Sequence, residues 1–264
     1  MLCHVKEIPY LYGEYIIKNK MKSYMPKIQK LSANISPFAG ISYVNAEFNR
    51  CGLSELIDTE LGVRGQGGGY SYSDIFRTWF DIFFCGGECA EDVQVHLGPS
   101  LKQIPDNSVP SADSLLRGIK ELAVDNTQVV STSDKTYQFN INDMMNGLLI
   151  KSLLLTKQLV SGQSYDFDYD NQILAHEKYD AKKTYKKNTG YFPGIASLGR
   201  NVIYVENRDG NANACTLRST RVKTGQAETL KRIYGSIKQN GMSVNRSRMD
   251  AGTYSEDIVD GVID

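Results

Sequence analysis

The sequence lacks any apolar run long enough to cross a membrane, and it has no leader typical of secretion. Its longest apolar runs, at 148–155 and 79–84, each contain a charged residue, Lys151 or Asp81. A membrane-spanning helix needs ~20 apolar residues. The first twenty residues do not show the basic-then-apolar order of a secretory signal. We therefore expect a globular protein of the cytosol that has no membrane partner.

Cysteine and histidine are too sparse for a disulfide framework or a structural zinc site. The 264 residues include five cysteines and three histidines. The one close cysteine pair, Cys85 and Cys89, has three residues between its members and no second pair to complete four zinc ligands. We therefore expect free thiols, as in a reducing compartment.

The chain has no net charge, which by itself argues against a nucleic-acid binder, but its charges are unevenly placed. Residues 54–92 hold eight acids and two bases, residues 211–248 hold eight bases and one acid, and residues 178–187 include five lysines. Any one cluster is also typical of solvated surface. Together the basic clusters lie on either side of an acid-rich segment in the sequence, which suits a polyanion held beside an acidic centre.

That acid-rich segment is the run YDFDYD at 165–170, in which Asp166, Asp168 and Asp170 occupy every second position. In a strand, side chains two residues apart leave the same face about 7 Å from each other. Like charges held that closely repel each other. The repulsion is tolerated when solvent screens it on a surface loop, when a divalent cation neutralises it, or when a raised pKa keeps one acid neutral. The aromatic residues between the acids favour a half-buried strand over a solvated loop.

Before residue 161 the apolar residues follow helical spacing. We expect two short helices separated at Gly52, a buried helix capped by Ser73, a helix capped by Ser111, and a longer apolar helix from about 142 to 160. The sequence thus predicts an arm over 1–35 and a helical, DNA-contacting domain over 36–160. Within that domain, the helix after Ser111 is better interpreted as structural packing than as a recognition helix.

After Gly162 the pattern alternates and predicts strands over SYDFDYD (164–170), GYFPGIASLG (190–199) and NVIYVEN (201–207), with a turn at Gly199–Arg200. A helix over 224–241, a strand over MSVNRSRMD (242–250) and a helix from Ser255 follow, so the predicted order is strand, strand, strand, helix, strand, helix. This order matches the opening of an RNase H-like fold, in which the first and fourth strands are parallel neighbours. We therefore expect an α+β protein: a helical N-terminal domain, then a partial RNase H-like mixed sheet with flanking helices over 161–264. Asp168 late in the first strand and Asp250 at the end of the fourth would converge at one sheet edge. Two carboxylates suit Mg²⁺ (or Mn²⁺).

At these residues the chain resembles a known family. YDFDYD, GYFPGIASLG, NVIYVENRDGNANA and VNRSRMDAGTYS resemble, in order, the blocks of DDE transposases from bacterial insertion sequences, in the group-one DDE domain type. The most specific block is RMDAGTYS. The resemblance implies Asp168 and Asp250 as catalytic, metal-binding acids, with Asp166 and Asp170 as flanking residues. It implies Mg²⁺-dependent cleavage of transposon ends and their joining to target DNA, by a nucleoid-associated protein that is a homodimer at full length.

The chain departs from this family in two places. The family requires a third acid, usually a glutamate on a later helix, and no residue downstream of Asp250 fits that role. We therefore expect a C-terminally truncated transposase that is inactive alone, because two acids leave a second metal under-coordinated. The arm over 1–35 also fits the family poorly. A non-catalytic DNA-binding remnant is the alternative function.

Two further interpretations concern the same segment and its basic neighbours. Residues 166–177 place acids at loop positions 1, 3, 5 and 12, which is most of an EF-hand calcium loop, but asparagine replaces the usual glycine at position 6. The entering helix is interrupted at Ser161–Gly162, which disfavours this alternative. Arg246 and Arg248 are candidate phosphate contacts or an edge that guards against strand addition. The other candidate DNA contacts are Lys182, Lys183, Lys186 and Lys187.

Overall fold

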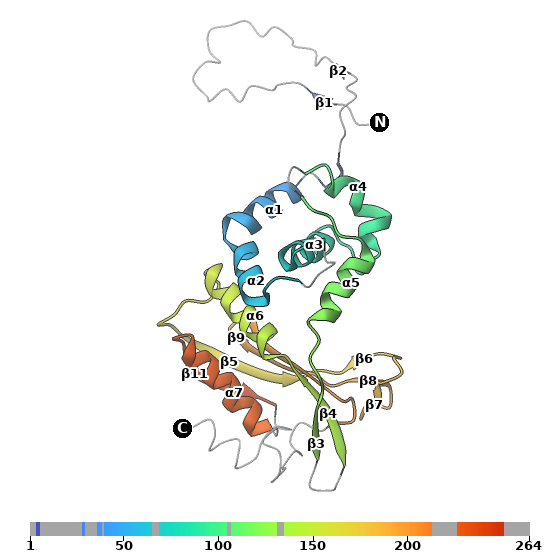
Figure 1. Ribbon diagram of the computed structural model, residues 1–264. Helices are drawn as coiled ribbons and strands as arrows, with labels where there is room; N and C mark the ends of the chain where they lie inside the picture. The colour runs from blue at the N-terminus through green and yellow to red at the C-terminus, as the bar shows by residue number, and fades with distance from the viewer. Residues whose placement is uncertain are drawn as a thin grey trace, which may run out of the picture.

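The computed structural model describes residues 4–5, 28–29, 36–38, 40–64, 69–104, 107–130, 135–212 and 226–250. These residues form an α+β structure with a helical layer above a mixed six-stranded sheet and a small three-stranded sheet beside it (Figure 1). The helices are α1 (Ile41–Arg50), α2 (Leu53–Leu61), α3 (Tyr72–Phe84), a π-helical turn (Val93–Leu97), α4 (Gly98–Leu101), α5 (Ala112–Glu121), α6 (Asp143–Leu155) and α7 (Gln226–Gln239).

The strands divide into three sheets. The six-stranded sheet has the order β11-β5-β9-β10-β4-β3, and the small sheet has the order β6-β8-β7, while β1 and β2 pair by themselves. Their bounds are β1 (His4–Val5), β2 (Ile28–Gln29), β3 (Thr127–Val130), β4 (Thr136–Ile141), β5 (Ser164–Asn171), β6 (Leu174–Ala175), β7 (Lys182–Lys183), β8 (Thr189–Tyr191), β9 (Gly194–Leu198), β10 (Asn201–Arg208) and β11 (Ser243–Met249).

Most helices of the helical layer begin and end close to the residues that the sequence predicts. Gly52 separates α1 from α2 in a left-handed conformation, and Ser111 caps α5 by accepting a hydrogen bond from the Ser114 amide. The predicted cap of α3 was wrong by two residues, because Ser71 forms the capping box with Asp74. Ser73 instead donates its hydroxyl proton to Asp58 at 2.7 Å, which joins α3 to α2.

The sheet is mixed because one connection is a helical crossover. Strands β5, β9, β10, β4 and β3 are antiparallel to their neighbours, whereas β11 runs parallel to β5 after the crossover through α7. The strands predicted over SYDFDYD (164–170), NVIYVEN (201–207) and MSVNRSRMD (242–250) are confirmed as β5, β10 and β11, as are the helix between the last two and the turn at Gly199–Arg200. The predicted strand over GYFPGIASLG is two strands, β8 and β9, separated at Phe192–Pro193.

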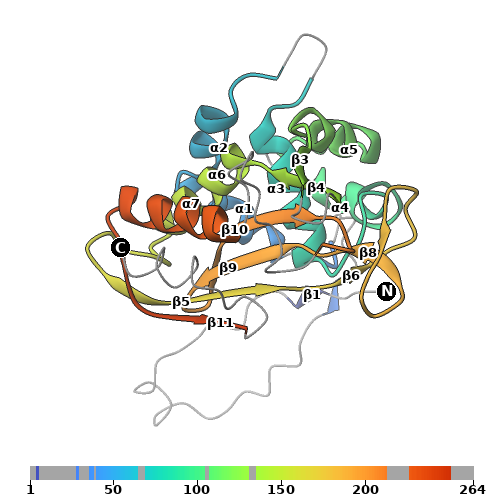
Figure 2. The same cartoon turned by 90° about the horizontal axis from the view of Figure 1, so that it is seen from below.

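Both α6 and α7 cover the same face of the sheet (Figure 2). Phe167 and Tyr169 of β5 point to this face and pack with Ile150 of α6 and with Leu230 and Ile233 of α7. Because successive side chains of a strand alternate between faces, Asp166, Asp168 and Asp170 belong to the other face. No helix among the described residues covers that face.

Two strands correct the expectation that residues 36–160 are purely helical. Strands β3 and β4 lie within this range, and β4 pairs with β10, so the sheet extends across the predicted boundary at residue 161. The helix predicted for 142–160 is also shorter and ends at Leu155. It contacts both α2 and β10, so it connects the helical layer to the sheet. The helix predicted from Ser255 lies outside the described residues.

The helices of the described residues are too short or too polar to span a membrane.

Candidate functional site

The parallel pairing of β11 with β5 brings acidic residues together at one edge of the sheet. Arg248 pairs with Asp168 and Met249 with Tyr169, where the pairing ends. Asp170 follows within β5, and Asp250 follows directly after the end of β11. The side chain of Asp170 belongs to the open face, and both acids are exposed. The predicted parallel pairing of the first and fourth strands is therefore confirmed. We call Asp168, Asp170 and Asp250 the acidic edge.

Asp168 does not face another acid within this register. Its carboxylate forms a two-bonded ion pair with Arg248, with Nε to Oδ1 at 2.6 Å and Nη2 to Oδ2 at 2.8 Å. These hydrogen bonds raise the pKa of the Arg248 guanidinium. Arg248, which was predicted to contact phosphate, thus neutralises the charge of Asp168 in this structure.

The same register explains how β5 holds three acids in a row. Arg246 is the neighbour of Asp166 and Arg248 is the neighbour of Asp168, so a cation of β11 offsets each of the first two acids. The third acid, Asp170, lies beyond the last pair of this register, as does Asp250. Carboxylate oxygens are ligands that suit Mg²⁺. Sequence reasoning treated Asp170 as a flanking residue, since strand register is absent from a single sequence.

The EF-hand interpretation requires residues 166–177 to fold around an ion, and they do not. Asp166, Asp168 and Asp170 lie along a regular strand that is paired with β11 on one side and β9 on the other. Their side chains therefore leave one face of an extended strand and do not lie on a loop that wraps around an ion. Among the residues that the structure describes, no three His, Cys, Asp or Glu side chains are grouped as they would be around a metal ion, either in this segment or at the acidic edge.

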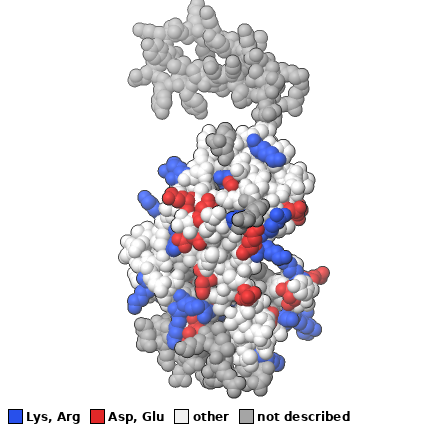
Figure 3. All heavy atoms as spheres, viewed as in Figure 1, with Lys and Arg blue, Asp and Glu red and all other residues white. Residues whose placement is uncertain are grey.

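The predicted lysine contacts lie on the small sheet that follows β5. Lys182 and Lys183 form β7, and Lys186 and Lys187 lie in the turn between β7 and β8. All four are exposed. Figure 3 shows Lys and Arg atoms gathered at the lower right, where Figure 1 places β7. Since β6 begins three residues after β5 ends, this basic surface adjoins the end of the sheet that carries the acidic edge.

A buried charged cluster between the sheet and the helices that cover it was not predicted. Glu206 and Arg208 of β10 are fully buried on the helix-covered face and form an ion pair. Arg208 also donates to the Tyr169 hydroxyl at 2.9 Å and to Gln226 of α7 at 2.8 Å, while Arg232 donates to Glu206 at 3.2 Å. Burial raises the pKa of Tyr169, which keeps its phenol protonated. The only sequence signal was charge at alternate positions of an apolar strand.

Tyr169 fastens the end of β5 to this buried cluster. Its ring lies on the face opposite Asp168 and Asp170, and its hydroxyl lies so close to Gly194 of β9 that a β-carbon there would overlap it. The end of β5, which carries Asp168 and Asp170, is thus fixed on its helix-covered face.

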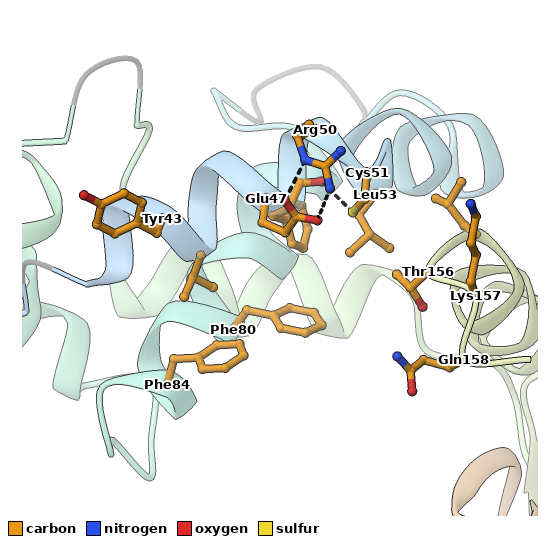
Figure 4. Close-up of a pocket in the computed structure, with 13 residues that line it drawn as sticks. Tyr43, Glu47, Arg50, Cys51, Leu53, Phe80, Phe84, Thr156, Lys157 and Gln158 are labelled. Atoms are coloured by element: carbon orange, nitrogen blue, oxygen red, sulfur yellow. Dashed lines mark hydrogen bonds and ion pairs between the residues drawn. The ribbon is translucent and has the colours of Figure 1, made fainter. Parts of the chain in front are cut away.

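A hollow of about 730 Å³ lies between α1, α3 and the end of α6 (Figure 4). Phe80 and Phe84 stack in it with ring centroids 6.3 Å apart, and Arg50 and Glu47 form an ion pair at its rim. Its lining is mostly apolar and its acid is already paired. The hollow therefore supplies no chemistry comparable to that of the acidic edge.

No protein family, curated protein or solved structure matches the chain. The geometry of the acidic edge and of the small sheet therefore carries the functional argument.

Proposed function

We propose that the chain contains the metal-binding centre of a DNA transposase, built on an RNase H-like sheet. The observation that carries the proposal is the parallel pairing of β11 with β5, after which Asp170 and Asp250 follow at the same end of the two strands. Ligand sites of open α/β sheets lie at such carboxyl edges. The resemblance of the strand sequences to those of DDE transposases supplies the kind of chemistry.

The strand order supports the RNase H-like interpretation. An antiparallel succession of β5, β9 and β10 is followed by α7 and by a return to β5 in the parallel direction. This is the order that the sequence pattern predicts for the first four strands of that fold. Strands β3 and β4 extend the sheet beyond β10 on the far side from the acids.

The donors at the acidic edge fit Mg²⁺ or Mn²⁺. Mg²⁺ takes oxygen ligands, keeps several waters, and needs only one or two protein carboxylates together with phosphate oxygens. Asp170 and Asp250, which directly follow the last pair of the β5–β11 register, would supply these carboxylates. When bound, such ions activate a water or a 3'-hydroxyl and stabilise the leaving oxygen of a phosphoryl displacement.

The other residues have supporting roles in this proposal. Asp168 remains a predicted ligand, and its carboxylate would join the metal by leaving Arg248, whose side chain is 56% exposed and has room to move. The released Arg248 and its neighbour Arg246 would then contact phosphate, as would Lys182, Lys183, Lys186 and Lys187. Bidentate arginine contacts suit phosphate oxygens.

Metal binding tests the site without requiring complete catalysis. We expect Mn²⁺, followed by its electron paramagnetic resonance signal, to bind the full chain, and we expect Asp170→Asn and Asp250→Asn to weaken binding at least tenfold. Asp166→Asn is the matched control, because it removes a carboxylate from the same strand and face beside Arg246. An equal loss of Mn²⁺ binding in Asp166→Asn, or unchanged Mn²⁺ binding in both Asp170→Asn and Asp250→Asn, would contradict the proposed metal site.

A second experiment separates the enzyme from a non-catalytic DNA-binding remnant. The exposed lysines of the small sheet favour DNA binding whether or not the acids react. Nicking of supercoiled DNA in Mg²⁺ that disappears in Asp250→Asn supports the enzyme. Because the chain is expected to be inactive alone, salt-dependent DNA retention without nicking supports the remnant only if Asp250→Asn also leaves Mn²⁺ binding unchanged. Tight Ca²⁺ binding with no DNA retention would contradict both.

A further inference from the structure

The small sheet presents two tyrosines to solvent among its lysines. Tyr179 is 101% exposed and Tyr185 is 70% exposed. Aromatic rings are seldom left so open, because each one exposes a large apolar surface to water. The two rings lie within the segment that supplies β6, β7 and β8, which we call the lysine–tyrosine sheet (residues 174–191).

The lysine–tyrosine sheet is also basic. Its residues include five lysines and two acids, a net charge of +3. One of the acids, Asp180, accepts a hydrogen bond from the Tyr191 hydroxyl at 2.7 Å. None of the five lysines forms an ion pair with another described residue, and the Lys186 ammonium lies 5.9 Å from the centre of the Tyr185 ring. The cationic groups are therefore available to an anion, and one of them is already placed beside an aromatic face.

This surface is built on a fixed backbone. Gly190 of β8 lies against the backbone of Leu174, and Gly210 lies against the backbone of Gly190. A β-carbon at Gly190 would overlap the Leu174 backbone, and one at Gly210 would overlap the Gly190 backbone. The Tyr185 ring packs edge-on against Phe192, with centroids 6.0 Å apart, and the buried Thr184 bonds to Asn188. The Tyr185 ring and the backbone that carries the lysines are consequently held in place before any ligand arrives.

We infer that the lysine–tyrosine sheet binds unpaired nucleotides of a DNA strand, with bases stacked on Tyr179 and Tyr185 and phosphates contacted by the lysines. In a duplex the base faces are covered by neighbouring bases, so exposed rings would gain little from it. Single-strand binding surfaces combine cationic groups with aromatic rings in this way.

The inference rests on the proposed function, which it deepens by naming the form of the DNA. The lysine–tyrosine sheet connects the end of β5 with the beginning of β9, and Asn171 of β5 pairs with Gly194 of β9. A DNA strand bound to the lysine–tyrosine sheet therefore lies beside the acidic edge. Unpaired nucleotides beside the metal ligands would leave a phosphodiester accessible for an in-line reaction.

The test compares a fluorescein-labelled 15-nucleotide single strand of mixed sequence with the duplex of the same sequence, by fluorescence anisotropy and without Mg²⁺. We expect the full chain to bind the single strand more tightly. Tyr179→Ala and Tyr185→Ala should each weaken that binding on the order of tenfold, since one base–aromatic stack is lost. Tyr179→Phe and Tyr185→Phe should bind like the wild type, because a phenyl ring also stacks. Tyr43→Ala, which removes a ring 80% exposed on α1, is the control and should have no effect.

Salt dependence separates stacking from phosphate contacts. Lys186→Ala, which removes the ammonium beside the Tyr185 ring, should reduce the slope of log affinity against log salt by about 0.7, the value for one phosphate of a single strand. The tyrosine variants should lower affinity and leave that slope unchanged. Preference for the duplex, unaltered binding in the tyrosine-to-alanine variants, or equal loss in Tyr43→Ala would overturn the inference.

The two proposals fail in distinguishable ways. If Asp170→Asn and Asp250→Asn leave Mn²⁺ binding unchanged while the tyrosine variants lose single-strand binding, the acidic edge is wrong and the nucleotide surface stands. If the acid variants lose Mn²⁺ and the tyrosine variants bind DNA normally, only the nucleotide surface is wrong.

Discussion

On the helix-covered face of the six-stranded sheet, the ion pair of Glu206 and Arg208 is fully buried, whereas on the other face the ion pair of Asp168 and Arg248 is in contact with water. Both pairs join an acid and an arginine on strands of one sheet. In the first pair every charge has been removed from solvent and the partners bond to Tyr169, Gln226 and Thr229 as well. In the second, both side chains can exchange their partner for water, a metal ion or a phosphate.

The comparison shows that burial decides what a charged pair can do. A buried pair is costly to break, because removing one partner leaves an uncompensated charge in the interior. An exposed pair contributes little to stability and can be opened at low cost. Glu206 and Arg208 therefore suit a structural role beneath β5, and Asp168 and Arg248 suit a role in which the pair opens.

The largest expected effect comes from breaking the buried pair. Arg208→Met should lower the free energy of unfolding by about 3–5 kcal/mol, because the Glu206 carboxylate loses its main partner in the interior. Urea denaturation followed by circular dichroism measures the change. Arg200→Met, at the exposed turn between β9 and β10, is the control and should change stability by less than about 0.5 kcal/mol.

A double variant sharpens the same comparison. Glu206→Leu combined with Arg208→Met removes both charges, so it should recover part of the loss seen for Arg208→Met alone. Arg232 is 28% exposed along its side chain and can turn toward water when Glu206 is absent. A double variant less stable than the single one would show that the hydrogen bonds of Glu206 to Thr229 and Tyr204 matter more than its charge.

An intermediate effect is expected for Asp81 of α3, a buried acid that forms no ion pair with another described residue. Burial raises its pKa to about 6, while a hydrogen bond from Asn45 at 3.2 Å partly opposes the shift. The folded state therefore binds more protons than the unfolded state between about pH 4 and pH 6. Stability should fall as pH rises through that window and then level off.

Asp81→Asn removes this dependence. At pH 7.5 the variant should be more stable than the wild type by on the order of 2 kcal/mol, since the cost of a buried charge disappears. Near pH 4 the two proteins should be nearly equal. Thermal unfolding at a series of pH values measures this, with the exposed Asp125→Asn as control. A variant that is less stable than the wild type at pH 7.5 would contradict the argument.

The smallest effect is expected for the exposed pair. Arg248→Ala should change the free energy of unfolding by no more than about 1 kcal/mol, and the difference should shrink in high salt. Its effect on Mn²⁺ binding should be opposite to that of the acid variants, because Asp168 becomes available as a ligand. Arg246→Ala is the control on the same strand. Weaker Mn²⁺ binding in Arg248→Ala would show that the arginine does not compete with the metal.

Local patterns were sufficient to predict most elements around the candidate site. Alternation of aromatic and acidic residues predicted β5, and the apolar spacing after residue 226 predicted α7, because each pattern reports which side of one element is buried. Strands β3 and β4 were missed because they lie between strong helical patterns and complete the sheet through β10, far along the chain. The shift of the α3 cap from Ser73 to Ser71 reflects two nearby serines with equal capping ability.

The sequence by itself determined that acids lie at alternate positions of one strand and that a second acid ends a later strand, since periodicity and composition are local properties. Only the tertiary structure decided which acids become neighbours. The register between β5 and β11 pairs Asp168 with Arg248 and ends one residue before Asp170 and Asp250, and a shift of two residues would give Asp168 a different partner. Register depends on the packing of Phe167 and Tyr169 under α7 and on contacts between distant segments, which no local pattern encodes.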